Sequence, residues 1–205
     1  MKKLSILFVA LIAAIGLEAQ ELDRSIRPTA QPAPELNIGE YEVIEMKNGL
    51  KVFVVQNDRL PRVTFRLVLD RDPILEGDKS GYVGMAGSMM DRGTTTRTKA
   101  EIDEEIDFLG ASLSTSSTGV FGNCLSAQTE EFFEIYADVL LNPSFPEEEF
   151  EKLKKENLDG LEFAKDNPDA ISAQVWNRLM YGAQHPYGDI ERKETVEAIT
   201  LEDCK

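Results

Sequence analysis

Strand-like and helix-like segments are segregated along this chain, and their order limits the fold more than any single motif does. Five segments carry the apolar pattern of strands and occur in two groups: residues 41–46, 50–55 and 63–69 near the start, and residues 111–117 and 120–127 in the middle. Short turns join neighbouring segments, which favours antiparallel pairing. Helical patterns fill most of the remainder. We therefore expect an α+β fold with two layers, in which a mostly antiparallel sheet packs on helices.

Two glycines are predicted to mark turns of this sheet. Asn48-Gly49 separates the first two strand segments, and this pair tolerates the positive φ angles of a type I′ hairpin turn. Gly119 separates the two segments of the second group and is predicted to lie between their strands.

Capping signals predict where the helices begin and end. Thr98 and Glu101 have the spacing of a capping box, and Gly110 stops the helix that they start. Further helices are predicted over residues 81–92, 129–141, 146–165 and 168–181. Thr200 and Asp203 form another capping box at the end of the sequence. A domain rarely stops in the first turn of a helix, so we expect this chain to be a C-terminally truncated fragment of a longer polypeptide.

The N-terminus has the three parts of a secretory signal peptide. Basic Lys2 and Lys3 precede an apolar run, residues 4–17, that is too short to span a bilayer comfortably, and small Ala19 suits the position before a cleavage site. We expect a signal peptide over residues 1–19, a proline-containing linker over residues 20–40 and the folded domain over residues 41–205. The protein is then exported into the bacterial envelope, as a periplasmic or secreted protein without an integral membrane segment.

Length and charge restrict the class of protein. The 205 residues suffice for one substantial domain. The formal net charge of −15 repels phosphate backbones, so we expect no nucleic-acid partner. Acidic residues gather in 101–107 and 147–162, which we interpret as solvated helix faces, with an acidic docking surface as the alternative. Cys124 and Cys204 are either a disulfide, which an oxidising compartment permits, or two unrelated buried thiols.

Five short strings resemble, in their order and spacing, the N-terminal domain of the insulinase/pitrilysin family of zinc peptidases, the inverzincins. The strings are Lys47-Asn48-Gly49-Leu50-Lys51-Val52, Gly93-Thr94, Leu109-Gly110-Ala111, Asp166-Asn167-Pro168 and His185-Pro186-Tyr187-Gly188. The resemblance extends over about residues 41–205. It implies a two-layer metalloenzyme domain, zinc as the family's cofactor, and clamshells built from repeated halves. In heterodimeric members, one of the two chains lacks the zinc motif.

The zinc motif of that family is degenerate in this chain. Active members carry H-x-x-E-H on the helix before Gly-Thr, where two imidazoles one helical turn apart bind the metal and the glutamate polarises its water. Counting back from Gly93-Thr94 places the two histidine positions at Gly84 and Ser88, and the glutamate position at Gly87. None of these residues can serve as the family's ligand or base.

Too few ligands remain elsewhere for a metal site of this kind. The family's distal glutamate ligand falls near Asp159 or Gly160, and Asp159 could bind a metal in principle but has no partner ligands left. His185 is the single histidine, and we expect it to be structural or exposed in its turn. We therefore predict no catalytic residue, no metal ligand and no cofactor in this chain. The two motif glycines indicate either that another segment packs closely on their helix or that the motif has drifted, and the sequence leaves both open.

Ser114, Thr115 and Ser116 lie on the segment that resembles the family's substrate-binding strand. Active members tend to place an Asn-Ala pair near Ser114-Thr115, and this chain departs from that pattern. A strand edge with small hydroxyl side chains can receive a peptide backbone through main-chain hydrogen bonds. The alternative is a plain solvated edge strand.

Three functions follow from these residues and from the resemblance. In the first, the chain is a non-catalytic subunit or scaffold that helps enclose unfolded peptides for a catalytic zinc peptidase, either a homologous subunit in a heterodimer or a second repeat. In the second, it is part of an active zinc metalloendopeptidase whose metal site lies in another region of a longer polypeptide. In the third, it is a peptide-binding module without a peptidase partner.

Overall fold

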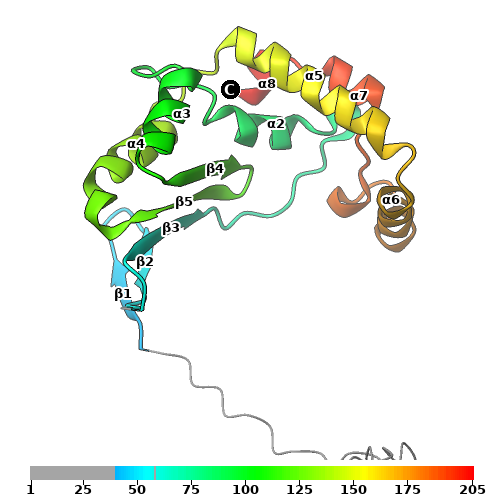
Figure 1. Ribbon diagram of the computed structural model, residues 1–205. Coiled ribbons are helices and arrows are strands. Elements are labelled where there is room, and N and C mark those ends of the chain that lie inside the picture. Colours follow the sequence, from blue (N-terminus) through cyan, green and yellow to red (C-terminus); the bar gives the residue numbers. More distant parts are fainter. Residues whose placement is uncertain (1–39, 58) are drawn as a thin grey trace, which may run out of the picture. The chain divides into compact units, whose positions relative to one another are not determined.

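The computed structural model describes residues 40–57 and 59–205 (Figure 1). The chain divides into two compact units, one ending at Gln56 and one running from Asn57 to Lys205. The predicted signal peptide, residues 1–19, and the linker residues 20–39 lie outside the described residues. Within the described part of the chain, no helix is both long and apolar enough to cross a bilayer.

Strands and helices follow the order that the sequence patterns predict. The strands are β1 (Glu42–Glu45), β2 (Lys51–Val54), β3 (Arg62–Val68), β4 (Ser112–Ser116) and β5 (Gly119–Leu125). The α-helices are α2 (Tyr82–Met89), α3 (Lys99–Phe108), α4 (Thr129–Leu141), α5 (Glu147–Ala164), α6 (Pro168–Tyr181), α7 (Lys193–Ala198) and α8 (Leu201–Cys204). Short 3₁₀ turns occur at η1 (Gly77–Lys79), η2 (Ser126–Gln128) and η3 (Pro186–Gly188). The sequence patterns did not predict α7, which is too short to show a helical period.

The first unit contains an antiparallel hairpin of β1 and β2, in which Glu42 pairs with Val54. The predicted turn residues lie at its tip, but the turn is not type I′. The backbone N–H of Gly49 donates to the carbonyl of Met46 at 2.9 Å, and of the Asn48-Gly49 pair only Gly49 has a positive φ, +89°. The turn is therefore shifted by one residue, so that the glycine alone adopts the left-handed region.

The second unit contains a three-stranded antiparallel sheet with the order β3-β5-β4. Gly119 is the first residue of β5 rather than a residue between the strands, which corrects the sequence prediction. Its φ is +151°, and a Cβ at this position would collide with the carbonyl oxygen of Leu67 on β3. The glycine is therefore needed for close strand contact, and Ser117 and Thr118 form the turn.

Two apolar clusters form the core of the second unit. The first lies between the sheet and helices α3 and α4, which cover one face of the sheet (Figure 1), and the second lies among α2, α5, α7 and α8. This packing of an antiparallel sheet on helices confirms the predicted α+β class. Cys124 belongs to the first cluster and Cys204 to the second, and both are buried free thiols, so they do not form a disulfide in this structure.

The predicted capping boxes are present. The Thr98 hydroxyl accepts from the backbone N–H of Glu101 at 3.3 Å, and the Glu101 carboxylate accepts from the backbone N–H of Thr98 at 2.7 Å. Gly110 follows α3 with a φ of +57°. Thr200 and Asp203 form the same reciprocal motif at the start of α8. These contacts lie within one helical turn, which is why the sequence alone predicts them.

A buried carboxylate ties α4 to the loop between α2 and α3. Asp138 of α4 accepts hydrogen bonds from the hydroxyls of Thr94 at 2.6 Å and Thr96 at 2.7 Å, and from the guanidinium of Arg97 at 2.8 Å. Asn142 donates to its other carboxylate oxygen at 2.9 Å. Burial by itself would raise the pKa of Asp138, but these bonds to the ionised form outweigh it and hold the pKa well below its ordinary value.

Replacing Asp138 by Asn should lower the free energy of unfolding by about 2–3 kcal/mol at neutral pH, because four donors lose a charged acceptor. The folded-state pKa lies below the value of about 3.9 of an unfolded aspartate, so this contribution is complete above that pH and is lost as the pH falls through the folded-state pKa. Urea unfolding at pH 7 and pH 3 measures the effect, and the difference between the two proteins should shrink at pH 3. Equal stability at pH 7 would contradict the role given to Asp138.

Candidate functional site

Helix α2 lies directly against the end of strand β4 at a glycine. A Cβ at Gly87 would collide with the backbone nitrogen of Ser117 and would stand 2.8 Å from the carbonyl oxygen of Ser116. Only glycine allows the helix backbone and the strand backbone to approach so closely. At Gly87, then, another segment packs closely on the helix, which was one of the two interpretations that the sequence left open.

The other two motif positions differ from Gly87. Gly84 lies one turn earlier and is exposed, and a Cβ there would meet no atom within 4 Å. Ser88 is partly buried and lines a pocket beside β4. Close packing therefore explains one of the two glycines, and nothing in the structure explains Gly84.

A polar pocket of about 330 Å³, here named the edge pocket, joins α2 to β4. Its lining residues are Ser88, Asp91, Arg92, Lys99, Ser114 and Thr115. Ser114 and Thr115 lie on β4, Ser88 lies on α2, and Asp91 and Arg92 follow that helix, so the edge pocket lies between β4 and the end of α2. The structure thus brings Ser88 together with Ser114 and Thr115. Ser116 lies outside the pocket, where its hydroxyl donates to the carbonyl of Gly119 at 3.1 Å.

Two residues that line the edge pocket have polar side-chain groups with few partners among the described residues. The carboxylate of Asp91 is partly buried and forms no ion pair or side-chain hydrogen bond with another described residue. Burial raises its pKa, although the nearby charges of Lys99 and Arg92 act in the opposite direction. The hydroxyl of Thr115 is buried and also has no hydrogen-bond partner. Most buried polar atoms in proteins are paired, so these two mark an unusual place in the structure.

Both cations of the edge pocket are already paired. The guanidinium of Arg92 bonds to Glu156 at 2.9 Å and lies 3.6 Å from Glu149, so it joins the end of α2 to α5. The ammonium of Lys99 is engaged by Asp103 on its own helix, α3.

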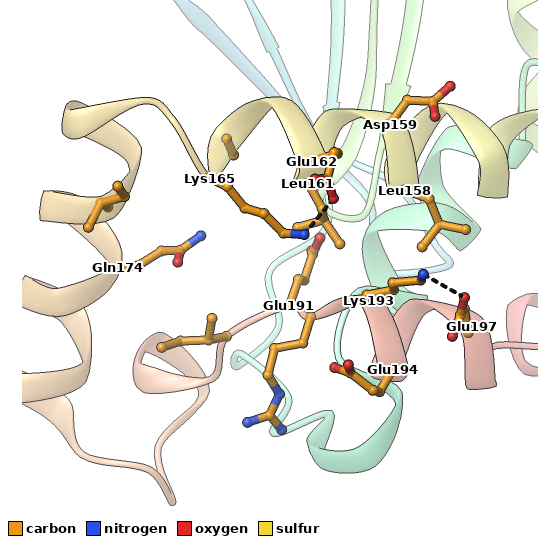
Figure 2. A pocket seen from close by; sticks show the side chains of 14 residues that line it. Leu158, Asp159, Leu161, Glu162, Lys165, Gln174, Glu191, Lys193, Glu194 and Glu197 are labelled. Carbon is orange, nitrogen blue, oxygen red and sulfur yellow. Dashed lines mark hydrogen bonds and ion pairs between the residues drawn. The ribbon is translucent and has the colours of Figure 1, made fainter.

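Asp159, the predicted position of the distal ligand, lies at a different cavity. This cavity of about 740 Å³ is lined by residues of α5, α6 and α7 and by the segment that precedes α7. Figure 2 shows the exposed carboxylate of Asp159 directed away from Lys193 and Glu197, an ion pair of 3.8 Å on α7. The structure therefore does not place Asp159 in the pocket that Ser88 lines.

His185 has a structural role, as predicted. Its Nδ1 accepts a hydrogen bond from the backbone N–H of Tyr187 at 3.1 Å, which caps the 3₁₀ turn η3. Its ring stacks on Tyr181 with the ring centroids 5.1 Å apart, and the side chain is exposed.

The residues at the motif positions do not fit a zinc ion held in the manner of H-x-x-E-H. Gly84 and Gly87 offer no side-chain donor, and Ser88 offers a hydroxyl where that motif has an imidazole. A glutamate at position 87 would need a Cβ in space that the backbone of β4 and its turn occupies. Within residues 40–57 and 59–205, no three or more His, Cys, Asp or Glu side chains converge into a group that could hold a metal ion. These positions of α2 supply neither the ligands nor the base of a metallopeptidase.

The model of the insulinase family, peptidase family M16, matches residues 55–185, which is more than half of the chain. The chain belongs to the insulinase family. The matched residues run from the end of the first unit to His185 and include all of the motif positions on α2 and α5.

Relatives in the insulinase family are longer than this chain. A zinc protease from Rickettsia felis is 27% identical over 169 residues, which cover 79% of this chain and 41% of the relative. The β subunit of mitochondrial-processing peptidase from Mus musculus is 27% identical over 193 residues, which cover 87% of this chain and 39% of the relative. This chain thus spans about two fifths of the length of these relatives.

Solved structures of two similar proteins share the fold. A peptidase M16 inactive domain from Pseudomonas fluorescens superposes with a TM-score of 0.72 at 23% identity, covering 80% of this chain and 42% of that one. A protease from Helicobacter pylori superposes with a TM-score of 0.68 at 21% identity, covering 82% and 42%. The architecture of this insulinase-family chain is therefore that of other peptidase M16 domains.

Sequence reasoning missed Asp91, Arg92 and Lys99 as residues of the site. Asp91 and Arg92 follow Ser88 by three and four residues, a spacing that places side chains on one face of a helix. That spacing was the available signal for these two. The contact of Lys99 with the pocket depends on how α3 lies against β4, which no local pattern reveals.

Gly84→Ala and Gly87→Ala are a matched pair of substitutions within one helix. Gly84→Ala should raise the free energy of unfolding by about 0.5–1 kcal/mol, because the methyl group meets open space and alanine restricts the unfolded chain. Gly87→Ala should lower it by about 1–3 kcal/mol, because the added Cβ overlaps the backbone of Ser116 and Ser117. Urea unfolding followed by circular dichroism measures both, and shifts in the same direction would disprove the close contact.

Proposed function

We propose that this insulinase-family chain is a non-catalytic subunit or scaffold that helps enclose peptide substrates for a catalytic zinc peptidase partner. The contact at Gly87 carries the proposal. In the family's motif this position holds the glutamate that polarises the zinc-bound water, and here the backbone of Ser116 and Ser117 occupies the space that such a side chain needs.

The imidazole positions support the same conclusion. The family's motif requires two histidines on one face of α2, whereas Gly84 and Ser88 stand there, and the single histidine of the chain caps a turn elsewhere. Bond cleavage is then assigned to another chain or another region. The contribution left to this domain is to hold a peptide near the catalytic centre, which accelerates a reaction through proximity and orientation.

Strand β4 is the surface on which a peptide is proposed to lie. Among the described strands it pairs only with β5, and an extended peptide adds to such an edge through main-chain hydrogen bonds. Ser112, Ser114 and Ser116 are small and exposed, so they leave the edge accessible to a peptide backbone. The edge pocket beside Ser114 and Thr115 gives room to a side chain of that peptide.

The partner is proposed to be a homologous catalytic subunit or a second repeat of the same polypeptide. This chain spans about two fifths of the length of its relatives, and one of those relatives is named as a subunit of a processing peptidase. The basic, apolar and small-residue parts of residues 1–19 support export, so we place this activity in the periplasm or outside the cell.

A second function is favoured by the zinc protease from Rickettsia felis among the relatives. In this case the chain is part of an active zinc metalloendopeptidase whose metal ligands come from a region outside these 205 residues. The α2 helix of this chain would still be a supporting element rather than the zinc site, because its motif positions lack donors.

Hydrogen exchange should detect a peptide on β4. The probe, here named the host peptide, is a short peptide of alternating threonine and glutamine that is capped at both ends and carries no charge. An excess of it should slow amide exchange in β4, whose free N–H groups gain acceptors, and should leave exchange in α4 unchanged. Mass spectrometry of proteolytic fragments measures both segments. Unchanged amide exchange in β4 would contradict the proposal that this strand binds a peptide.

Affinity capture from the native envelope tests the partner. The chain should recover a homologous chain, or a longer form of itself, that carries H-x-x-E-H. If β4 is protected by peptide but no such homologue is ever recovered, the chain is a peptide-binding module without a peptidase partner.

A further inference from the structure

We propose that the exposed apolar side of helix α6 is the surface on which the catalytic partner docks, and that this partner presents an apolar surface of its own insulinase-family domain. The inference rests on the proposed function, because it requires that such a partner exists. It adds where on this chain the partner binds and what kind of surface the partner must have.

Helix α6 is the one described α-helix without a buried residue. It is attached near its C-terminal end, where the guanidinium of Arg178 donates to the carbonyl of Gly188 at 2.9 Å and the Tyr181 ring stacks on His185. Figure 1 shows α6 beyond the end of α5 and away from the sheet. No residue of α6 belongs to either apolar cluster of the core.

The apolar residues of α6 lie together along one side of the helix, here named the α6 face. Ile171, Val175 and Leu179 are spaced four residues apart and therefore form a stripe, which Trp176 and Met180 widen. Their exposed fractions run from 45% for Ile171 to 78% for Leu179. A groove of about 460 Å³ on this side of the helix is lined by Pro168, Ile171, Ser172, Val175, Trp176 and Leu179.

The α6 face has the properties of a protein–protein interface. A helix at the surface of a domain is normally stabilised by burial of its apolar stripe, and α6 does not bury its stripe against any described segment. Large contiguous apolar patches on proteins mark interaction sites. The single tryptophan of the chain, Trp176, lies in this patch, and tryptophan is enriched among the residues that dominate binding energies.

The length of the relatives indicates what covers the α6 face. The matched region makes up 41% of the zinc protease from Rickettsia felis and 42% of the solved chain from Pseudomonas fluorescens. More than half of each of these polypeptides therefore lies outside the matched domain and is available to pack against it. We assign the α6 face of this chain to the corresponding further domain, which the catalytic partner supplies.

The charges near the α6 face restrict the partner's surface. Within residues 170–181 the single charged side chain is Arg178, which is bound to Gly188. Asp166 and Asp169 are exposed beside the start of α6. The matching surface is therefore apolar at its centre and basic at the rim that meets these carboxylates. A second copy of this chain fits less well, because each copy has a net charge of −15 and would bring the same carboxylates.

Affinity capture from the native envelope tests the α6 face with a matched pair of substitutions. Leu179→Glu places a charge on the α6 face, and Leu141→Glu places the same charge at the end of α4, where the leucine is similarly exposed (78% and 72%). The unaltered chain and Leu141→Glu should both recover a homologous chain that carries H-x-x-E-H, identified by mass spectrometry. Leu179→Glu should recover at least about tenfold less of it.

Fluorine NMR then locates the contact. When 5-fluorotryptophan is incorporated into this chain alone, it gives one resonance, from Trp176. Addition of the purified homologue should shift or broaden that resonance in the unaltered chain and in Leu141→Glu. The same concentration of homologue should leave the resonance of Leu179→Glu unchanged.

Each outcome supports or overturns the docking surface. If the homologue binds Leu179→Glu as tightly as the unaltered chain, the α6 face is wrong and the partner of the proposed function stands. If no homologue is recovered by any of these chains, the partner and its docking surface both fail. A dimer of this chain alone in sedimentation velocity, abolished by Leu179→Glu, would assign the α6 face to a second copy instead. Should Leu179→Glu lose its helical circular dichroism, Met180→Glu on the same face replaces it in both measurements.

Discussion

The direct contact between the backbones of α2 and β4 determines what this domain can do. At Gly87 the helix rests on the backbone of Ser116 and Ser117, and only a residue without a side chain has room there. The contact also joins the two parts of the core, because α2 carries Met85 and Met89 into one apolar cluster while β4 belongs to the sheet that bounds the other. The close contact of α2 with Ser116 and Ser117 therefore leaves no room at Gly87 for the glutamate that the family's zinc motif requires there.

Polar contacts near the end of α2 also stabilise the position of this helix in the domain. Asp138 binds the loop that follows α2 to α4, and Arg92 binds the end of α2 to Glu156 on α5. The resemblance to active insulinase-family members implies that zinc links the motif helix to the later long helix. In this chain the guanidinium of Arg92, in the turn that follows α2, binds α5 through Glu156, and a partly exposed ion pair of this kind is a modest connection that needs no metal. The domain can thus keep its α2–α5 contact while lacking the family's ligands.

Sequence patterns predicted the elements that depend on residues close together in the chain. They missed the features that depend on residues far apart in the chain. The capping box at Thr98 and the helix over residues 129–141 depend on neighbours within a turn or two, and both are present as predicted. Gly119 was expected between two strands, but its conformation is required by Leu67, which the pairing of β5 with β3 brings against it. The donors to Asp138 are also far away in the chain, with Thr94 separated from it by 44 residues. Asp91 lines a pocket only because the fold brings Ser114 and Thr115 of β4 close to it.

The central claim is that α2 supplies neither the ligands nor the base for zinc-dependent hydrolysis. The most direct measurement is cleavage of an unfolded peptide by the purified chain, with and without a zinc chelator. We predict no hydrolysis above the blank in either sample. Hydrolysis that stops when the chelator is added and returns when zinc is restored would contradict the claim.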